Sequence, residues 1–166
     1  MVSSIASEFL GYSADKLELY LSRIETCLGQ LTPEQIWARH SENENAVGNL
    51  VLHLEGNLRQ WILGGVGGQP DVRDRHSEFE ARAGAGPADL KRQIRATIEE
   101  ATAIVRNVPH ERLTERIQPQ GHDVSVLEAI YQTVQHLSGH AFQIMLLTKL
   151  HTGRDLGFFA HLNRPK

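Results

Sequence analysis

The sequence has 166 residues, 40% hydrophobic and 22% charged, a composition typical of one soluble globular domain, and we expect a single domain over residues 1–166. Its formal net charge of −3 argues against a nucleic acid as partner. The single cysteine, Cys27, excludes an internal disulfide and favours a reducing, cytoplasmic location. We expect neither a signal peptide nor a membrane span, because no basic segment precedes an apolar run at the N-terminus and no apolar stretch approaches the ~20 residues that a bilayer requires.

Four long segments have the periodicity of amphipathic helices, with hydrophobic residues recurring every three to four positions. They cover approximately residues 4–29, 46–63, 87–107 and 126–152. Glycines that favour a helix end follow three of these segments, namely Gly29, Gly64 and Gly153. Ser125 followed by Glu128 is a capping-box pattern at the start of the fourth segment. The sequence therefore predicts an all-α protein built as a four-helix bundle.

The connections between these helices differ in length and character. After the first helix, Thr32, Pro33 and Gln35 indicate a short capped helix. Residues 64–86, between the second and third helices, are glycine-rich and much longer than a tight antiparallel turn requires. Such a crossover lets the second and third helices run parallel, in an up-down-down-up order, and it is either a lid or binding loop or a mobile surface loop. Residues 116–118 precede a proline and are expected to be extended.

Three histidines on two of the predicted helices are the principal candidates for chemistry. His53 lies in the second helix, and His136 and His140 lie four residues apart in the fourth, where they share one face. Each histidine falls roughly 80–120° around its helix from the centre of the apolar stripe. From these positions the three imidazoles can point between the two helices. Three imidazoles with an open coordination position form a catalytic type of metal site.

A histidine at the edge of a helix core face is also commonly a half-buried residue that only makes hydrogen bonds. The sequence contains neither H-E-x-x-H nor a repeated E-x-x-H, so glutamate-containing metal motifs are missing. It also lacks a nucleotide-binding glycine loop and a G-x-S-x-G nucleophile motif. The remaining histidines are expected on the surface, with His122 as the best accessory candidate: His40, His76, His110, His122, His151 and His161.

Amide side chains one helical turn from the three histidines are candidates to orient the imidazole rings. They are Asn49 and Asn57 near His53, and Gln132 and Gln143 near the histidine pair. Glu55 is two residues from His53 and is expected to point elsewhere. Cys27 lies beside apolar residues of the first helix, so we expect it to pack in the core.

The order of these motifs resembles the DinB/YfiT-like superfamily of metalloenzymes. The matching features are a histidine within NLVLHLEGNLRQWI, H-x-x-x-H within TVQHLSGHAFQI about eighty residues later, the SVLEAI helix start and the long central crossover. The resemblance covers nearly the whole chain. It implies an up-down-down-up four-helix bundle, usually a homodimer, with a divalent metal, often zinc or nickel, held by His53, His136 and His140. Some relatives transfer low-molecular-weight thiols such as bacillithiol, or use mycothiol in isomerisation.

Three functional hypotheses follow. In the first, the protein is a metal-dependent transferase or hydrolase that acts on a small electrophile, with a low-molecular-weight thiol as one possible substrate. In the second, it is a non-catalytic module that binds a metal or a small ligand. In the third, it is a structural dimer in which Trp61 or the C-terminal residues 157–162 anchor the interface, although Phe158 and Phe159 are expected to pack on their own bundle. Catalytic residues other than the metal ligands are not assigned.

Overall fold

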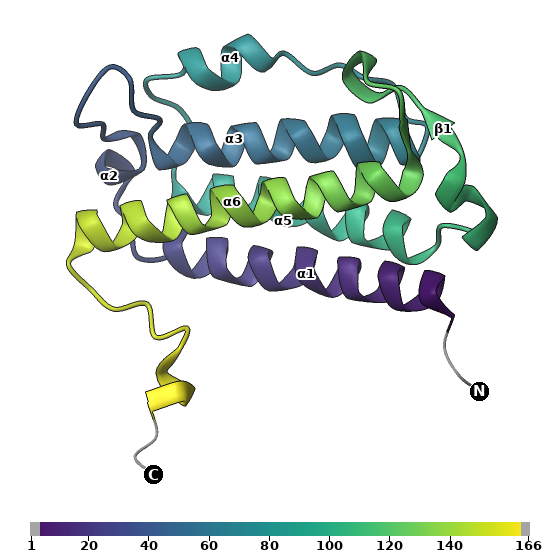
Figure 1. Ribbon diagram of the computed structural model, residues 1–166. Helices are drawn as coiled ribbons and strands as arrows, with labels where there is room; N and C mark the ends of the chain where they lie inside the picture. Colours follow the sequence, from purple (N-terminus) through teal and green to yellow (C-terminus); the bar gives the residue numbers. More distant parts are fainter. Residues whose placement is uncertain (1–3, 164–166) are drawn as a thin grey trace.

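The computed structural model describes residues 4–163, which are mostly helical (Figure 1). Its long helices are α1 (Ile5–Leu28), α3 (Val47–Leu58), α5 (Pro87–Arg106) and α6 (Val126–Thr152). Helix α1 contacts α5 and α6, and α3 contacts the same two helices, so the four surround a common core. The bounds of each helix agree with those of a predicted segment to within a few residues, except at the C-terminal end of α3, where the chain continues as a different kind of helix.

The helix ends follow the predicted capping residues. At the start of α6, the Ser125 hydroxyl accepts a hydrogen bond from the Glu128 backbone N–H, and the Glu128 carboxylate accepts one from the Ser125 backbone N–H. Gly153 ends α6 with a φ of 66°, a left-handed conformation that favours glycine. These local interactions explain why both ends of the longest helix were predictable.

Helix α3 continues into η1 (Arg59–Val66), a π-helix, and does not stop at Gly64 as predicted. The tertiary packing outweighs the glycine signal here, because Trp61, Ile62 and Val66 are all buried. The π-helix has a wider turn than an α-helix and is frequently found at functional sites. In this protein it places Trp61 against the cavity described below.

The crossover between η1 and α5 contains a further helix, α4 (Arg75–Glu80), which was not predicted from the sequence. Asp74 caps it by accepting hydrogen bonds from the backbone N–H groups of His76 and Ser77. The Asn49 side chain on α3 donates to the carbonyl oxygens of Glu78 and Ala81, at 2.9 Å each. These hydrogen bonds hold the crossover beside α3, where α4 lies in Figure 1.

The remaining elements are short. The predicted capped helix is α2 (Pro33–Trp37), with the capping box of Thr32 and Gln35 present. The expected extended residues form β1 (Arg116–Ile117), which pairs antiparallel with β2 (Val124–Ser125). Three 3₁₀-helices complete the described chain: η2 (His110–Thr114), η3 (Pro119–Gly121) and η4 (Ala160–Asn163).

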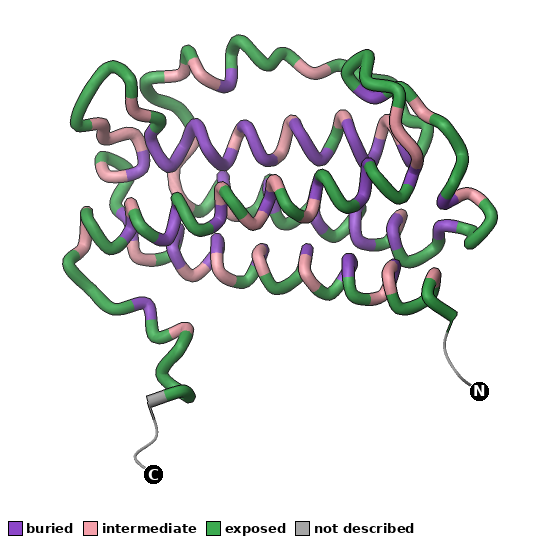
Figure 2. The backbone as a smooth tube through the Cα atoms, viewed as in Figure 1, coloured by how far each residue is buried: buried purple, intermediate pink, exposed green. Residues whose placement is uncertain are grey.

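The core lies between the four long helices, whose inward faces are buried along their length (Figure 2). Cys27 is fully buried in it, as predicted. Phe158 packs partly against the core, whereas Phe159 is 47% exposed. Among residues 4–163, no helix combines the length and the apolar character needed to cross a bilayer.

Candidate metal centre

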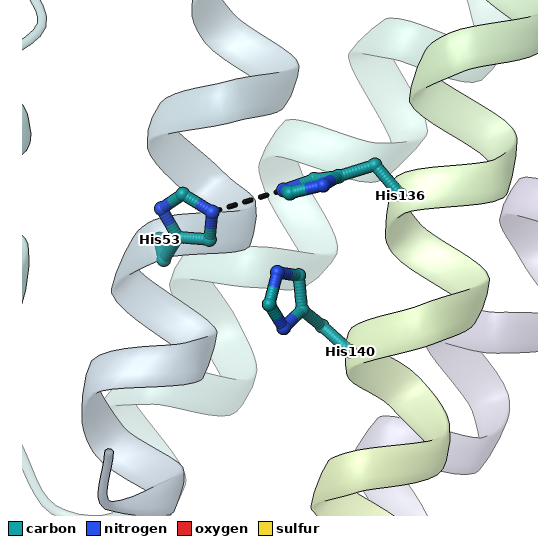
Figure 3. Close-up of side chains that lie close together, drawn as sticks. All are labelled: His53, His136 and His140. Carbon is teal, nitrogen blue, oxygen red and sulfur yellow. Dashed lines mark hydrogen bonds between the residues drawn. The ribbon is translucent and has the colours of Figure 1, made fainter. Parts of the chain in front are cut away.

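The three histidines that the sequence singled out converge between α3 and α6 (Figure 3). Nε2 of His53 lies 2.9 Å from Nε2 of His136. One ring nitrogen from each of His53, His136 and His140 lies within 4.8 Å of the others. The His136 and His140 rings, one turn apart on α6, have centroids 4.5 Å from each other and face the His53 ring across the helix interface. The expected convergence therefore exists.

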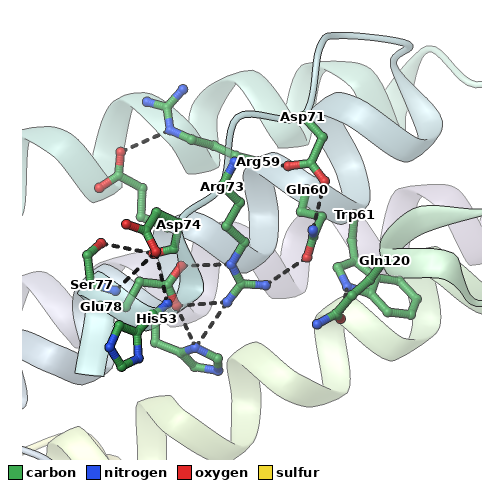
Figure 4. Close-up of polar contacts among 12 residues, drawn as sticks. His53, Arg59, Gln60, Trp61, Asp71, Arg73, Asp74, Ser77, Glu78 and Gln120 are labelled. Atoms are coloured by element: carbon green, nitrogen blue, oxygen red, sulfur yellow. Dashed lines mark hydrogen bonds and ion pairs between the residues drawn. The ribbon is translucent and has the colours of Figure 1, made fainter. Parts of the chain in front are cut away.

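The other ring nitrogen of His53 faces a carboxylate from the crossover (Figure 4). Nδ1 of His53 lies 3.0 Å from Oε2 of Glu78, and both side chains are buried. Nδ1 also lies 3.1 Å from a terminal nitrogen of Arg73, but that nitrogen already donates to Oε2 of Glu78 at 2.8 Å. Since an ionised carboxylate only accepts hydrogen bonds, the contact with Glu78 favours the tautomer with the proton on Nδ1. Nε2 then carries the free lone pair and points toward His136. In protein metal sites, the ring nitrogen of a histidine that does not bind the metal commonly donates its proton to a carboxylate in this way.

Arg73 keeps the Glu78 carboxylate ionised and in place. Its Nε and one terminal nitrogen donate to the two carboxylate oxygens, at 2.7 and 2.8 Å. Its other terminal nitrogen donates to Gln60 of η1 at 2.9 Å, and Gln60 in turn donates to Asp71. Burial by itself would raise the pKa of Glu78, but the hydrogen bonds from Arg73 and His53 outweigh it and hold this pKa below its ordinary value.

Gly56 provides the space for this buried ion pair against α3. A Cβ atom at this position would overlap Oε1 of Glu78 and lie 2.9 Å from Nε of Arg73. The glycine, one turn away from His53, therefore lets the crossover approach the helix that carries this histidine.

Neither Glu78 nor Arg73 was predicted from the sequence. The available signal was local: Asp74 is a residue type favoured at helix N-caps, and an acidic residue in the first turn, Glu78, is favourable at a helix N-terminus.

The candidate orienting amides have different roles in the structure. Gln143 fulfils its expected role, because its Oε1 lies 2.7 Å from Nδ1 of His140. The prediction for Asn49 was wrong, since its buried side chain binds Arg39 and the crossover backbone and makes no hydrogen bond to His53. Asn57 and Gln132 line the neighbouring cavity. Glu55 points elsewhere, as predicted, and pairs with Arg59 at 3.0 Å.

His136 and His140 are held in the neutral form in which they can bind a metal. Burial, followed by the nearby charges of His140 and His53, lowers the pKa of His136 to about 4. Burial also lowers the pKa of His140, although its hydrogen bond to Gln143 acts in the opposite direction. At neutral pH these two rings therefore offer lone pairs, and no proton has to be displaced from them before a metal binds.

This donor set fits a divalent transition metal. Imidazoles that share a tetrahedral zinc ion, with bonds near 2.05 Å, have nitrogens about 3.3 Å apart. That spacing lies between the 2.9 Å of the His53–His136 pair and the 4.8 Å limit for the whole cluster. Three neutral nitrogen ligands suit zinc, nickel, copper or iron better than magnesium or calcium, which prefer oxygen.

A cavity of about 650 Å³ opens beside His53 and His136. Trp61, which was considered for a dimer interface, is only 6% exposed and forms part of the cavity wall. His122 also lines the cavity and stacks on the Trp61 ring with centroids 5.9 Å apart. The Trp61 indole N–H donates to Oε1 of Gln120, a residue with the uncommon φ of 54°. A histidine cluster at the wall of a cavity is the arrangement expected of a ligand site.

The other histidines lie away from the cluster. His40 stacks on His151 with ring centroids 5.6 Å apart, and it pairs with Glu44. Nε2 of His110 lies 3.3 Å from the Ser7 hydroxyl. His76 and His161 are exposed. The expectation of a surface position is confirmed for His40, His76, His110 and His161. It was wrong for His151, which is half-buried and whose Nε2 atom is enclosed by the protein.

Comparisons with known proteins support the resemblance in fold. A solved structure described as a DinB-like protein from Bacillus cereus aligns with a TM-score of 0.64 and 14% sequence identity, covering 82% of this chain and 88% of that chain. No curated protein matches the sequence. The family model described as "Protein of unknown function (DUF1572)" matches residues 4–160. The chain therefore belongs to the DUF1572 family, and its fold is that of a DinB-like protein.

Proposed function

We propose that this protein is a metal-dependent enzyme that transforms a small molecule in the cavity beside His53, His136 and His140. The observation that carries the proposal is the convergence of three ring nitrogens within 4.8 Å of one another, with two of the three histidines, His53 and His136, lining that cavity. A divalent zinc or nickel ion held there would act as a Lewis acid and lower the pKa of a thiol or water at its open position.

The protein groups around the cluster support this role. Glu78 and Gln143 hold the rings of His53 and His140 through their second nitrogens, which fixes the direction of the lone pairs. Burial keeps the neighbouring His136 neutral. The cavity supplies a site for a bound molecule next to His53 and His136, two of the residues that would hold the ion.

We favour transfer of a low-molecular-weight thiol to an electrophile over hydrolysis. Glu128 is the carboxylate among the residues that line the cavity, and it is occupied by the cap of α6 and by Arg116. No free carboxylate is therefore available in the cavity wall as a general base for water, and His122 is the remaining side chain there that could accept a proton. A thiol needs only to lose its proton to become a strong nucleophile, and a metal ion that lowers the pKa of the thiol can accomplish this without a carboxylate base.

We also propose the helix order, the oligomeric state and the location that the superfamily resemblance and the sequence suggest. The arrangement in Figure 1, with the crossover leading from α3 to a parallel α5, supports an up-down-down-up four-helix bundle formed by one domain. Large apolar side chains exposed on α6, including Phe142, Leu146 and Leu150, support a homodimer. We also retain the cytoplasmic location that the single cysteine suggests.

The test is elemental analysis of protein purified without an affinity tag, followed by activity measurements. We expect about one zinc or nickel ion per chain, and its loss in His136→Ala. His161→Ala, at an exposed histidine outside the cluster, is the matched control and should retain the metal. Full metal content in His136→Ala would refute the site.

Activity separates the functional alternatives. The metal-loaded protein is assayed with a panel of thiols and a chromogenic electrophile, and in parallel with activated esters. Thiol-dependent turnover that disappears in His136→Ala supports the proposal. Ester hydrolysis alone would indicate a hydrolase, and stoichiometric metal without any turnover would indicate a non-catalytic binding module.

A further inference from the structure

The cavity beside the histidine cluster has an excess of positive charge on one side. Its charged lining residues are Arg73, Arg75 and Glu128. Arg73 is neutralised by the buried carboxylate of Glu78, and Glu128 is paired with Arg116. Within residues 4–163 no carboxylate forms an ion pair with Arg75. Arg75 is therefore the uncompensated charge of the cavity.

The Arg75 guanidinium is held beside the histidine cluster by a stack of side chains. Its central carbon lies 4.9 Å from the centroid of the Phe79 ring, one turn along α4. The Phe79 ring in turn lies 4.8 Å from the His53 ring. This stacking restricts the guanidinium to the wall of the cavity while it leaves the N–H donors along its edge available to a ligand.

The rest of the cavity wall is suited to an uncharged body. Trp61, Val124 and Tyr131 contribute apolar surface, and His122 lies stacked on the indole of Trp61. Flat or apolar groups gain from contact with such a surface. The cavity thus combines an apolar region with one guanidinium and a cluster of imidazole nitrogens.

We propose that the cavity selects small organic carboxylates, with Arg75 binding the carboxylate while the apolar or planar body of the molecule lies against Trp61. This inference rests on the proposed function only in treating the cavity as the substrate site, and it specifies the class of molecule. Guanidinium and carboxylate match in geometry and charge, so a carboxylate should be preferred over a neutral group of the same shape.

The test compares benzoate with benzamide, which has nearly the same shape but no charge. Both are titrated into metal-stripped protein, and binding is followed through the indole N–H nuclear magnetic resonance signal of Trp61. The sequence contains two tryptophans, so Trp37→Phe assigns that signal. Stripped protein is used because benzoate could otherwise bind to the ion itself, and zinc-loaded protein serves as a parallel sample.

We expect benzoate to bind about fivefold more tightly than benzamide, which is the discrimination one solvent-accessible ion pair can provide. Arg75→Gln should bring the ratio of the two dissociation constants close to one, and Arg75→Lys should retain part of the preference. Arg82→Gln is the matched control, because it removes the same charge from the same crossover but not from the lining of the cavity. It should keep the preference of the unmodified protein.

Three outcomes would overturn the inference: equal affinities in the unmodified protein, an unchanged preference in Arg75→Gln, or no binding of either compound. None of them depends on the metal, since the decisive titration is made without it. Conversely, failure of the protein to take up zinc or nickel would refute the proposed function and leave this titration interpretable.

Discussion

Nδ1 of His53, on α3, lies 3.0 Å from Oε2 of Glu78, on a helix of the crossover 25 residues later in the chain. This contact joins the histidine cluster to the segment that covers α3, so a candidate metal ligand and the crossover depend on each other. The Arg73 guanidinium completes the link by binding both oxygens of the same carboxylate.

The first prediction concerns this contact. Glu78→Gln should weaken zinc binding by about 10- to 100-fold, because the amide can present its N–H₂ group to Nδ1 of His53 and no longer favours the tautomer with Nε2 free. Affinity is measured by competition with a chelator. Glu80→Gln, at an exposed position of the same helix, is the control and should bind zinc normally. Equal affinity in the two variants would exclude a positioning role for Glu78.

The second prediction concerns the space that Gly56 provides. Gly56→Ala should reduce the free energy of unfolding by about 1–3 kcal/mol, because the added methyl group displaces the buried carboxylate of Glu78 from Arg73. Gly11→Ala, inside α1 about two turns from its start and with open space around the added methyl group, should instead stabilise the protein by up to about 1 kcal/mol. Urea unfolding measures both values, and a stabilised Gly56→Ala variant would contradict the packing described here.

The third prediction is a dependence of stability on pH. The pKa of His136 is lowered to about 4 in the folded protein, whereas an unfolded histidine titrates near 6.5. Between these values the unfolded chain binds the proton and the folded chain does not, so the stability present above pH 6.5 is lost as the pH falls toward 4. Urea unfolding of metal-free protein should show this decline, and His136→Gln should show a shallower one. Parallel curves for the two proteins would argue against a buried neutral His136.

The fourth prediction concerns Cys27. Burial raises the pKa of this thiol, with a smaller opposing effect of a hydrogen bond to Thr148, and the side chain has no exposed surface. A disulfide reagent added to native protein should therefore react slowly, whereas denatured protein should release one equivalent at once. Rapid reaction under native conditions would show that α1 opens at this point.

Several elements were accessible from the sequence because their causes are local. The apolar periodicity of the four long segments located the helices, and the capping residues Ser125 and Glu128 fixed the start of α6. The i, i+4 spacing of His136 and His140 placed both on one face, and Gln143 was found because its partner His140 lies one turn away on the same helix.

Only the tertiary structure decided the features that join distant parts of the chain. The π-helical continuation through Gly64 arises from burial of Trp61 and Val66, which no local signal at the glycine reports. Glu78 and Arg73 reach His53 because the crossover folds back along α3, and their spacing in the sequence does not encode that contact. Helical periodicity fixes which face a side chain occupies, whereas the packing of the whole core fixes what that face meets. For this reason the sequence alone identified the three histidines and the local partner Gln143, and only the fold supplied Glu78 and Arg73.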